Sequence, residues 1–244
     1  MRINIFNCPI DTFTMAETIE KIDKSIQNRN HLHHVVVNAA KLINMQKDIE
    51  LYNSVVNADI INPDGQAVVW ASRILKQPLP ERVAGIDIMQ NIVKLAFEKG
   101  YRIFFLGAKE EIVKGVVERY SKEFSSEIVA GYRNGYFGKE EESVAREIAE
   151  SRADILFVAI SSPTKEIFLE KYKEIIDAPF IMGVGGSFDV VSGKVKRAPL
   201  WMQKSGLEWF FRFLQEPRRM WRRAFITNGK FILLVLKEYL KNKK

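Results

Sequence analysis

The sequence is poor in the features that mark secreted, membrane-spanning and zinc-binding proteins. Its 244 residues contain one cysteine, Cys8, which excludes an intramolecular disulfide and a cysteine-rich zinc site. A single thiol fits a reducing compartment. The first residues lack the apolar core of a signal peptide, and the longest uninterrupted apolar run near the end, residues 231–236, is far too short to cross a bilayer. We therefore expect a cytoplasmic protein.

Several sequence motifs for cofactors and metals are also absent. The chain has no phosphate-binding loop of nucleotide hydrolases, no dinucleotide fingerprint and no Asp-x-Asp pair. His31, His33 and His34 lie close together, but no cysteine or glutamate pattern joins them, so we expect a solvated start of a strand and no metal site. We expect an activity that needs neither a cofactor nor a metal ion.

Charge is distributed unevenly along the chain, whose net charge is +7. Residues 196–244 hold 13 Lys and Arg against 3 Asp and Glu, a balance of +10, which leaves −3 for residues 1–195. A basic tail on a mildly acidic body indicates an anionic partner for the tail. Charge alone admits nucleic acid, an anionic membrane surface or a diphosphate.

Segments typical of strands and of helices alternate through residues 1–195. Short apolar runs predict strands, and apolar residues at helical spacing predict the helices between them. The predicted strands cover residues 1–6, 34–38, 58–61, 102–106, 126–131, 154–160 and 180–184, and the predicted helices cover residues 14–28, 39–53, 66–75, 85–99, 110–121, 140–151 and 165–176. This alternation predicts an α/β fold with a mostly parallel, Rossmann-like sheet flanked by helices.

The alternation stops after Gly193. Three helical stretches follow, over residues 199–205, 208–214 and 217–239, the last with a weak point at residues 228–229. They contain three of the four tryptophans and many arginines. We therefore expect residues 1–195 to form the α/β catalytic domain and residues 196–244 to form a helical appendage.

A carboxylate and an arginine are the first candidates for chemistry. Asp64 lies between Pro63 and Gly65, directly after an apolar run, where the chain turns into a helix. Catalytic residues are common at such strand ends in α/β folds. Arg82 follows about one helix later, and a reaction that moves a proton beside an anion needs such a pair. Alternatively, Asp64 only caps the helix over residues 66–75.

Other candidates for binding lie at neighbouring strand ends. Gly107 follows a buried run and begins a helix, an arrangement that favours an anion. Gly185 and Gly186 allow a ligand to approach the backbone while Asp189 accepts hydrogen bonds from a base or a sugar; alternatively, this is a tight turn with a capping Asp. Asn38 ends the strand expected beside Asp64 and either holds a sugar hydroxyl or caps the next helix.

Arginines and aromatic side chains alternate in the appendage around Pro217. Guanidinium groups bind phosphates through two parallel hydrogen bonds, so a diphosphate is a natural ligand. The same composition describes a surface that lies on an anionic membrane. A solvated basic face above an aromatic core is the third interpretation. The residues concerned are Arg212, Arg218, Arg219, Arg222 and Arg223, with Trp209, Phe210, Phe211, Trp221 and Phe225.

The order of these motifs resembles the WecG/TagA/CpsF family of bacterial glycosyltransferases over nearly the whole chain. The resemblance rests on Asn38, Asp64-Gly65, residues 78–87, residues 105–107, residues 183–189, Gly193 and residues 214–223. It implies transfer of a sugar from a UDP-sugar to a sugar carried on a polyprenyl diphosphate, with inversion to a β-linkage. It also implies a peripheral position on the inner face of the membrane and a role in teichoic acid, capsule or other cell-surface polysaccharide synthesis.

The resemblance assigns a role to each matching residue. Asp64 corresponds to the proposed general base, Arg82 to an arginine that stabilises the leaving UDP, and Asp189 to a uridine-binding carboxylate. Asn38 corresponds to a substrate-pocket residue, and Gly107, Gly185 and Gly186 lie in the matching glycine turns. Arginines of the appendage are implied to meet the lipid diphosphate; they are Arg212, Arg219 and Arg222.

The chain departs from the family at two positions. Val36 stands where the family often has Thr, and Lys165 stands where it has a pocket Gln. An ammonium in place of an amide could change which sugar fits, so we expect Lys165 to contact the donor sugar or its diphosphate.

Two rival functions and one open question remain. One rival is a phosphate- or nucleic-acid-binding α/β module, and the other is a non-catalytic scaffold of a polysaccharide assembly complex. The resemblance favours the enzyme, with no nucleic acid as partner. The sequence leaves the oligomeric state open, a homo-oligomer included.

Overall fold

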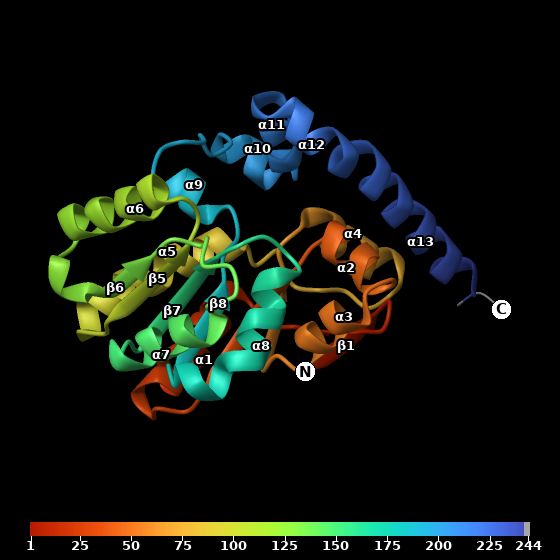
Figure 1. Cartoon of the computed structure of the whole chain (residues 1–244). Coiled ribbons are helices and arrows are strands. Elements are labelled where there is room, and N and C mark those ends of the chain that lie inside the picture. Colours follow the sequence, from red (N-terminus) through yellow and green to blue (C-terminus); the bar gives the residue numbers. More distant parts are fainter. Residues whose placement is uncertain (242–244) are drawn as a thin grey trace.

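A six-stranded sheet in which every neighbouring pair runs parallel forms the centre of the molecule (Figure 1). The computed structural model describes the backbone of residues 1–241, with the side chains of Arg219 and residues 222–224 left out. In spatial order the strands are β4 (Ile60–Pro63), β3 (Leu32–Val37), β8 (Phe180–Gly183), β7 (Ile155–Ala159), β5 (Ile103–Gly107) and β6 (Val129–Arg133). The predicted α/β fold with a parallel sheet is confirmed.

Apolar residues on both faces of each central strand explain why the sheet is covered twice. β5 and β7 are buried along their whole length, which is typical of parallel strands between two layers of helices. Successive side chains alternate between the layers: Phe105 packs into one core cluster, and Phe104 packs into another.

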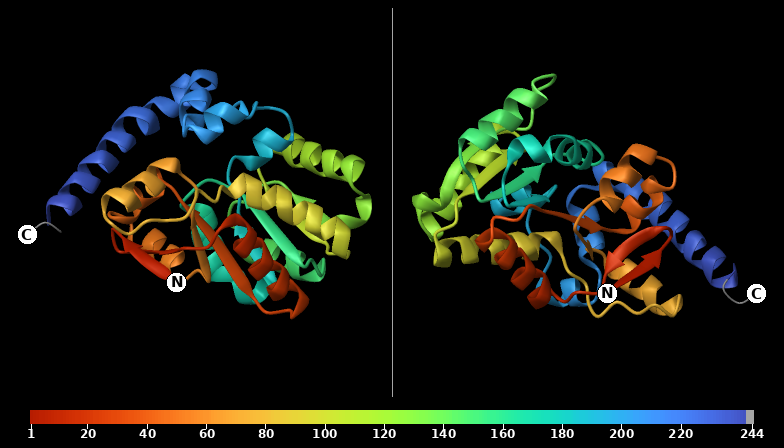
Figure 2. Two further views of the ribbon diagram at one scale, coloured as in Figure 1. Left: turned by 180° about the vertical axis from the view of Figure 1, so that it is seen from behind. Right: turned by 90° about the horizontal axis from the view of Figure 1, so that it is seen from below.

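Helices form a layer on each face (Figure 2). One layer contains α1 (Met15–Gln27), α5 (Gly85–Lys99), α6 (Glu110–Glu123) and α9 (Ser187–Val191), with the short η1 (Ser126–Ile128) leading into β6. The other contains α3 (Ile49–Val56), α7 (Glu141–Glu150) and α8 (Thr164–Ile176). α2 (Ala39–Met45) and α4 (Gln66–Ile74) cover the end of the sheet at β3 and β4. A capping box between Thr14 and Glu17 begins α1 where the sequence predicted it.

One helix prediction was wrong, and one strand was not predicted. The single helix predicted over residues 39–53 is two helices, because Asp48 adopts an extended conformation and caps α3 by accepting from the Leu51 N–H. The first residues do form a strand, β1 (Arg2–Ile5), but it lies outside the main sheet. It pairs antiparallel with β2 (Cys8–Asp11), which the sequence analysis missed, in a separate hairpin.

Residues beyond α9 contain, within the described part of the chain, four short helices and a longer final one. They are α10 (Leu200–Lys204), α11 (Glu208–Gln215), α12 (Pro217–Trp221), the π-helical η2 (Arg222–Thr227) and α13 (Asn228–Lys241). The irregular segment thus directly precedes the predicted weak point. α13 packs beside α2 and α4 (Figure 1), where Phe231 and Val235 join the core cluster that contains Phe6. None of the helices within residues 1–241 combines the length and apolarity that a bilayer crossing requires.

Candidate active site

The carboxyl ends of β3 and β4 bring Asn38 and Asp64 together, as predicted. Val37 and Pro63 are register partners, and the Asp64 N–H donates to the Val37 carbonyl over 2.8 Å. Asn38 does cap α2, because its Oδ1 accepts from the Lys41 N–H over 3.1 Å. That hydrogen bond fixes the amide plane, and Nδ2 is the end of the amide that the cap does not use. The capping and binding interpretations of Asn38 are therefore compatible.

Asp64 is oriented by a helix other than the one that the sequence suggested. Gly65 is the N-cap of α4 and makes no side-chain cap, whereas Asp64 Oδ1 accepts from the N–H of Gly85, the first residue of α5, over 3.2 Å. The positive end of a helix dipole favours an ionised carboxylate. A general base must start in that form, so this position suits proton abstraction.

The loop that carries Arg82 is fixed to the same strand end. The Val83 N–H donates to the Pro63 carbonyl over 2.9 Å, which holds the loop beside Asp64. The Arg82 side chain is 14% exposed, and its Nη2 lies 2.8 Å from Oε2 of Glu208 in α11. The appendage therefore reaches the candidate site and contacts one of its predicted residues directly.

Glycines at the ends of β5 and β8 let other backbone and side-chain groups approach closely. Gly107 has a φ of +120°, and a Cβ there would come within 2.6 Å of the Ala159 backbone. A Cβ on Gly186 would come within 2.5 Å of Arg212 Nη2, so the Arg212 guanidinium lies against this turn. The structure thus brings Arg212 of the appendage to the predicted turn of Gly185 and Gly186.

Asp189 lies one turn beyond these glycines, in the first turn of α9. Its Oδ1 is 3.4 Å from Nζ of Lys194, and its backbone carbonyl accepts from the Val195 N–H over 2.9 Å. The N-cap of α9 is Gly186, so Asp189 is not a capping residue in the sense of the alternative interpretation. A ligand that uses this carboxylate has to share it with Lys194.

A buried ion cluster lies where the sequence placed only Lys165. Lys165 and Glu166 lie in the first turn of α8, and Lys41 lies in the first turn of α2. Oε1 of Glu166 is 2.6 Å from Lys165 Nζ and 2.7 Å from Lys41 Nζ. Burial alone would raise the pKa of the Glu166 carboxyl, but the two ammonium groups outweigh it and lower that pKa to about 2. The Lys165 stem lies against Gly183 at the end of β8.

Lys41 and Glu166 were missed as candidates. Lys41 interrupts the apolar side of α2, whose neighbours Ala39 and Leu42 are buried, and a lysine in that position signals a buried partner. Glu166 gave no signal of its own, because its partner Lys41 is distant in sequence and meets it only through the fold.

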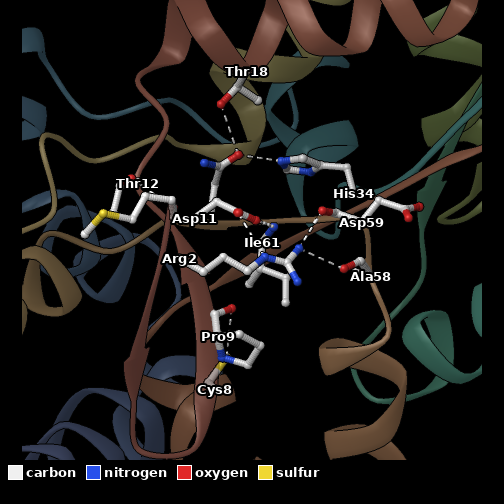
Figure 3. A network of polar contacts seen from close by, with 12 residues as sticks. Arg2, Cys8, Pro9, Asp11, Thr12, Thr18, His34, Ala58, Asp59 and Ile61 are labelled. Atoms are coloured by element: carbon white, nitrogen blue, oxygen red, sulfur yellow. Dashed lines mark hydrogen bonds and ion pairs between the residues drawn. The ribbon is translucent and has the colours of Figure 1, made fainter.

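The prediction of a solvated start of a strand was wrong for two of the three histidines, since only His31, directly before β3, is exposed. His33 and His34 are buried, and His34 Nε2 lies 2.8 Å from Asn62 Oδ1, which also accepts from the Thr18 hydroxyl (Figure 3). Burial lowers the pKa of His34 to about 4, so the ring is neutral near pH 7.

The same network holds the hairpin to the sheet. Arg2 and Asp11 form an ion pair of 2.9 Å, while Arg2 also donates to the Asp59 carbonyl and Asp11 accepts from the Ile61 N–H (Figure 3). These contacts are structural. Within the described residues, no three His, Cys, Asp or Glu side chains converge so as to hold a metal ion.

Exposed apolar side chains gather on the appendage. α11 has no buried residue, and the exposed apolar side chains of residues 200–236 include Leu200, Trp201, Trp209, Phe210, Leu214, Trp221, Phe225, Ile226, Leu233 and Leu236. The predicted diphosphate contacts of Arg219 and Arg222 concern side chains outside the described part of the chain.

Comparisons with known proteins add a family and several relatives. The family model described as "Glycosyl transferase WecG/TagA/CpsF family" matches residues 3–244. A protein of Bacillus subtilis (strain 168) is 41% identical over 198 residues, which are 81% of this chain and 76% of the relative. A protein of Staphylococcus aureus (strain MW2) is 30% identical over 246 residues, which are 100% of this chain and 96% of the relative. Both relatives are named N-acetylglucosaminyldiphosphoundecaprenol N-acetyl-beta-D-mannosaminyltransferase.

Proposed function

The chain belongs to the WecG/TagA/CpsF family of glycosyl transferases, and on that premise we propose a specific reaction for it. It is a glycosyltransferase of cell-surface polysaccharide synthesis, and it transfers an N-acetylhexosaminyl group from a UDP-sugar to N-acetylglucosamine carried on undecaprenyl diphosphate. The names of the relatives support both the acceptor and a β-linked product. The single observation that carries the assignment to this site is the meeting of Asn38, Asp64 and Arg82 at the ends of β3 and β4.

The reaction is one displacement with inversion at the anomeric carbon. The acceptor hydroxyl attacks this carbon and gives its proton to the Asp64 carboxylate, while the bond from the carbon to the β-phosphate oxygen breaks. UDP leaves as an anion, and the Arg82 guanidinium stabilises the charge that develops on its β-phosphate. The hydrogen bond from Gly85 to Asp64 supports this role, because the N-terminus of α5 favours the ionised carboxylate that a general base needs.

The carboxyl ends of β8 and β5 supply the donor site. Gly107, Gly185 and Gly186 let the uridine nucleotide approach the backbone, and Asp189 accepts hydrogen bonds from it. Lys165 contributes to the choice of sugar, because it replaces a family glutamine and its stem lies against Gly183 at the end of β8. Because Lys165 is buried and paired with Glu166, its charge acts on the donor sugar from behind the end of β8.

The appendage, residues 196–244, binds the anionic surface of the membrane and meets the lipid diphosphate. Its balance of +10 and its exposed aromatic side chains support a peripheral position on the inner face. Arg212 is the described arginine best placed for the diphosphate, since it lies against Gly186. Arg219 and Arg222 are proposed to share that role. A homo-oligomer remains a prediction.

Turnover on a lipid-linked acceptor tests the reaction and its base. The purified chain is incubated with a panel of UDP-sugars and a short-chain polyprenyl-diphosphate N-acetylglucosamine, and UDP release is measured together with product mass. Asp64→Asn should lower turnover at least about a hundredfold while UDP binding stays near that of the wild type. Asp48→Asn is the matched control, because it makes the same change at a carboxylate that only caps α3.

Each outcome has a defined meaning. Near-normal turnover of Asp64→Asn would remove Asp64 as the base, and a large loss of stability in this variant would support a purely capping role. No UDP release with any UDP-sugar would overturn the donor assignment.

Membrane binding is tested by flotation with anionic vesicles. Replacing the exposed Trp201, Trp221 and Phe225 by Ser should abolish flotation. Ile49→Ser, at a still more exposed apolar side chain of the body, should not. Unchanged flotation of the triple variant, or binding of an oligonucleotide in preference to vesicles, would contradict the proposed position.

A further inference from the structure

One carboxylate of the appendage lies between two arginines at the candidate site. Glu208 Oε2 is 2.8 Å from Arg82 Nη2, and Glu208 Oε1 is 3.5 Å from Arg197 Nε. Each oxygen therefore faces a different guanidinium. Two arginines that converge on one anionic group form the arrangement that proteins use to hold phosphate. The structure shows this arrangement with a side chain of the same protein as the anion.

Arg197 is anchored to the helix that orients the candidate base. Its Nη1 lies 2.6 Å from Oδ1 of Asp87, in the first turn of α5, and Gly85 of the same turn donates to Asp64. Arg82 precedes this turn by three residues. The loop before α5 and the first turn of α5 thus contact Asp64 and Arg197 and carry Arg82, although Arg197 belongs to the appendage.

Arg197 retains donor capacity for a further anion. Its Nη2 is shielded from solvent and has no hydrogen-bond partner among the described residues. Buried donors are normally satisfied in proteins, so an unpartnered one beside a candidate ligand site points to a group that binds there. Asp87 keeps the guanidinium in place whether or not Glu208 is present.

We propose that Arg197 is a second diphosphate-binding arginine, which acts with Arg82 on the diphosphate of the UDP-sugar, and that the Glu208 carboxylate holds their site until the donor displaces it. This inference rests on the proposed function. The Glu208 side chain is 30% exposed, so its ion pairs are weak and exchangeable. A diphosphate offers more charge and more acceptor oxygens than one carboxylate, and it therefore competes successfully for both guanidinium groups.

The exchange also relates donor binding to the position of α11. Glu208 is the first residue of that helix, so displacing its carboxylate loosens one tie between the appendage and the body while the Asp87–Arg197 pair stays in place. The site is then complete with two cations facing the leaving group, where each stabilises the charge that forms as the glycosidic bond to UDP breaks.

Calorimetric titration with two ligands tests the role of Arg197. UDP carries the diphosphate, whereas uridine lacks it and reports only on the nucleoside part of the site. Arg197→Met in the full-length chain should weaken UDP binding by about tenfold to a hundredfold, the usual effect of losing a charge-assisted hydrogen-bonding pair, and leave uridine binding unchanged. Lys196→Met is the matched control, because the exposed Lys196 is adjacent in the same segment and the charge lost is the same.

Glu208→Gln provides a second, opposite test that does not depend on the folding of Arg197→Met. Removing the competing charge should tighten UDP binding about two- to fivefold, the range expected for a partly exposed ion pair, with uridine binding unchanged. UDP binding of Arg197→Met equal to that of the wild type, or equal losses for UDP and uridine, would overturn the role of Arg197. Weaker UDP binding by Glu208→Gln would overturn the exchange.

These outcomes are separable from failure of the proposed function. If the wild type binds UDP and releases it from a UDP-sugar while Arg197→Met behaves like the wild type, the function stands and this inference fails. If the wild type does not bind UDP at all, the donor assignment is overturned and this inference with it.

Discussion

Two glutamates in this molecule each lie between two cations, yet their surroundings differ. Glu166 lies between Lys41 and Lys165 in the body and is 2% exposed, whereas Glu208 lies between Arg82 and Arg197 at the junction with the appendage and is 30% exposed. No water can replace the buried carboxylate, so removing it leaves the two lysine ammonium groups without a counter-charge. The partly exposed carboxylate of Glu208 is within reach of water, so water or another anion can take its place at a smaller cost.

The difference teaches what each cluster can do. Glu166 ties α8 to α2, and both helices begin at the carboxyl edge of the sheet, so this pairing fixes the backbone around the candidate site. Glu208 joins two separately anchored arginines through contacts that a ligand can take over. The cations fit this division, because arginine binds phosphate through two parallel hydrogen bonds, whereas lysine acts as a compact point charge.

The largest expected effect comes from breaking the buried cluster. Glu166→Gln should lower the free energy of unfolding by about 3–5 kcal/mol, because both ammonium groups lose their counter-charge inside the protein. Glu208→Gln should lower it by less than about 1 kcal/mol. Urea unfolding of the two variants at neutral pH compares the same substitution in two environments. Equal losses for both would remove the distinction drawn here.

Acid should remove the contribution of Glu166 over a defined range. Because the folded state holds the pKa of this carboxyl at about 2, below its ordinary value of 4.5, its stabilisation is complete above about pH 4.5 and is lost as the pH falls toward about 2. That shift corresponds to about 3 kcal/mol. The difference in unfolding free energy between the wild type and Glu166→Gln should therefore shrink across this range. A difference that stays constant with pH would contradict the ionised, paired state of Glu166.

Lys165→Gln should have a smaller effect on stability and a visible one on donor choice. Lys41 still pairs with Glu166 in this variant, so the fold keeps a counter-charge for the carboxylate. The excess positive charge at the end of β8 is lost, and we expect the ratio of turnover between donors in a UDP-sugar panel to shift about three- to tenfold, the effect of roughly 1 kcal/mol. Lys171→Gln, an exposed site on the same helix, is the control. An unchanged donor profile would show that Lys165 has only a structural role.

Salt should produce the smallest effect and should act on one cluster alone. The twofold to fivefold gain in UDP affinity expected for Glu208→Gln over the wild type should shrink toward one at about 1 M salt, where charges at the surface are screened within about 3 Å. The stability difference between Glu166→Gln and the wild type should persist, because buried pairs are screened much less. An affinity gain that survives high salt would show that Glu208 acts by shape and not by charge.

The sequence predicted the parts of the molecule that local patterns determine. Buried runs such as residues 103–107 gave the strands, the Thr14 capping box gave the start of α1, and the turn around Asp64 placed a carboxylate beside Asn38. The break before α3 escaped prediction because its apolar periodicity continues through Asp48, and only the cap reveals it.

Contacts between distant segments could not be predicted. Neither the pairing of Lys41 with Glu166 nor the approach of Glu208 to Arg82 leaves a pattern in local sequence, since each joins residues more than a hundred positions apart. The same holds for the hydrogen bond from Gly85 to Asp64, which required the relative placement of β4 and α5. The burial of His33 beside Glu170 of α8, and of His34 beside Asn62, likewise depends on contacts between distant segments.

The contact of Phe6 with Phe231, whose ring centroids are 5.8 Å apart, has a consequence for biosynthesis. The hairpin is synthesised long before α13, the helix whose Phe231 packs on Phe6. Until α13 is made, the chain therefore carries an exposed apolar surface on the hairpin, and such surfaces are binding sites for chaperones. A message cut short before α13 would yield a product that keeps this surface and is open to recognition by proteases.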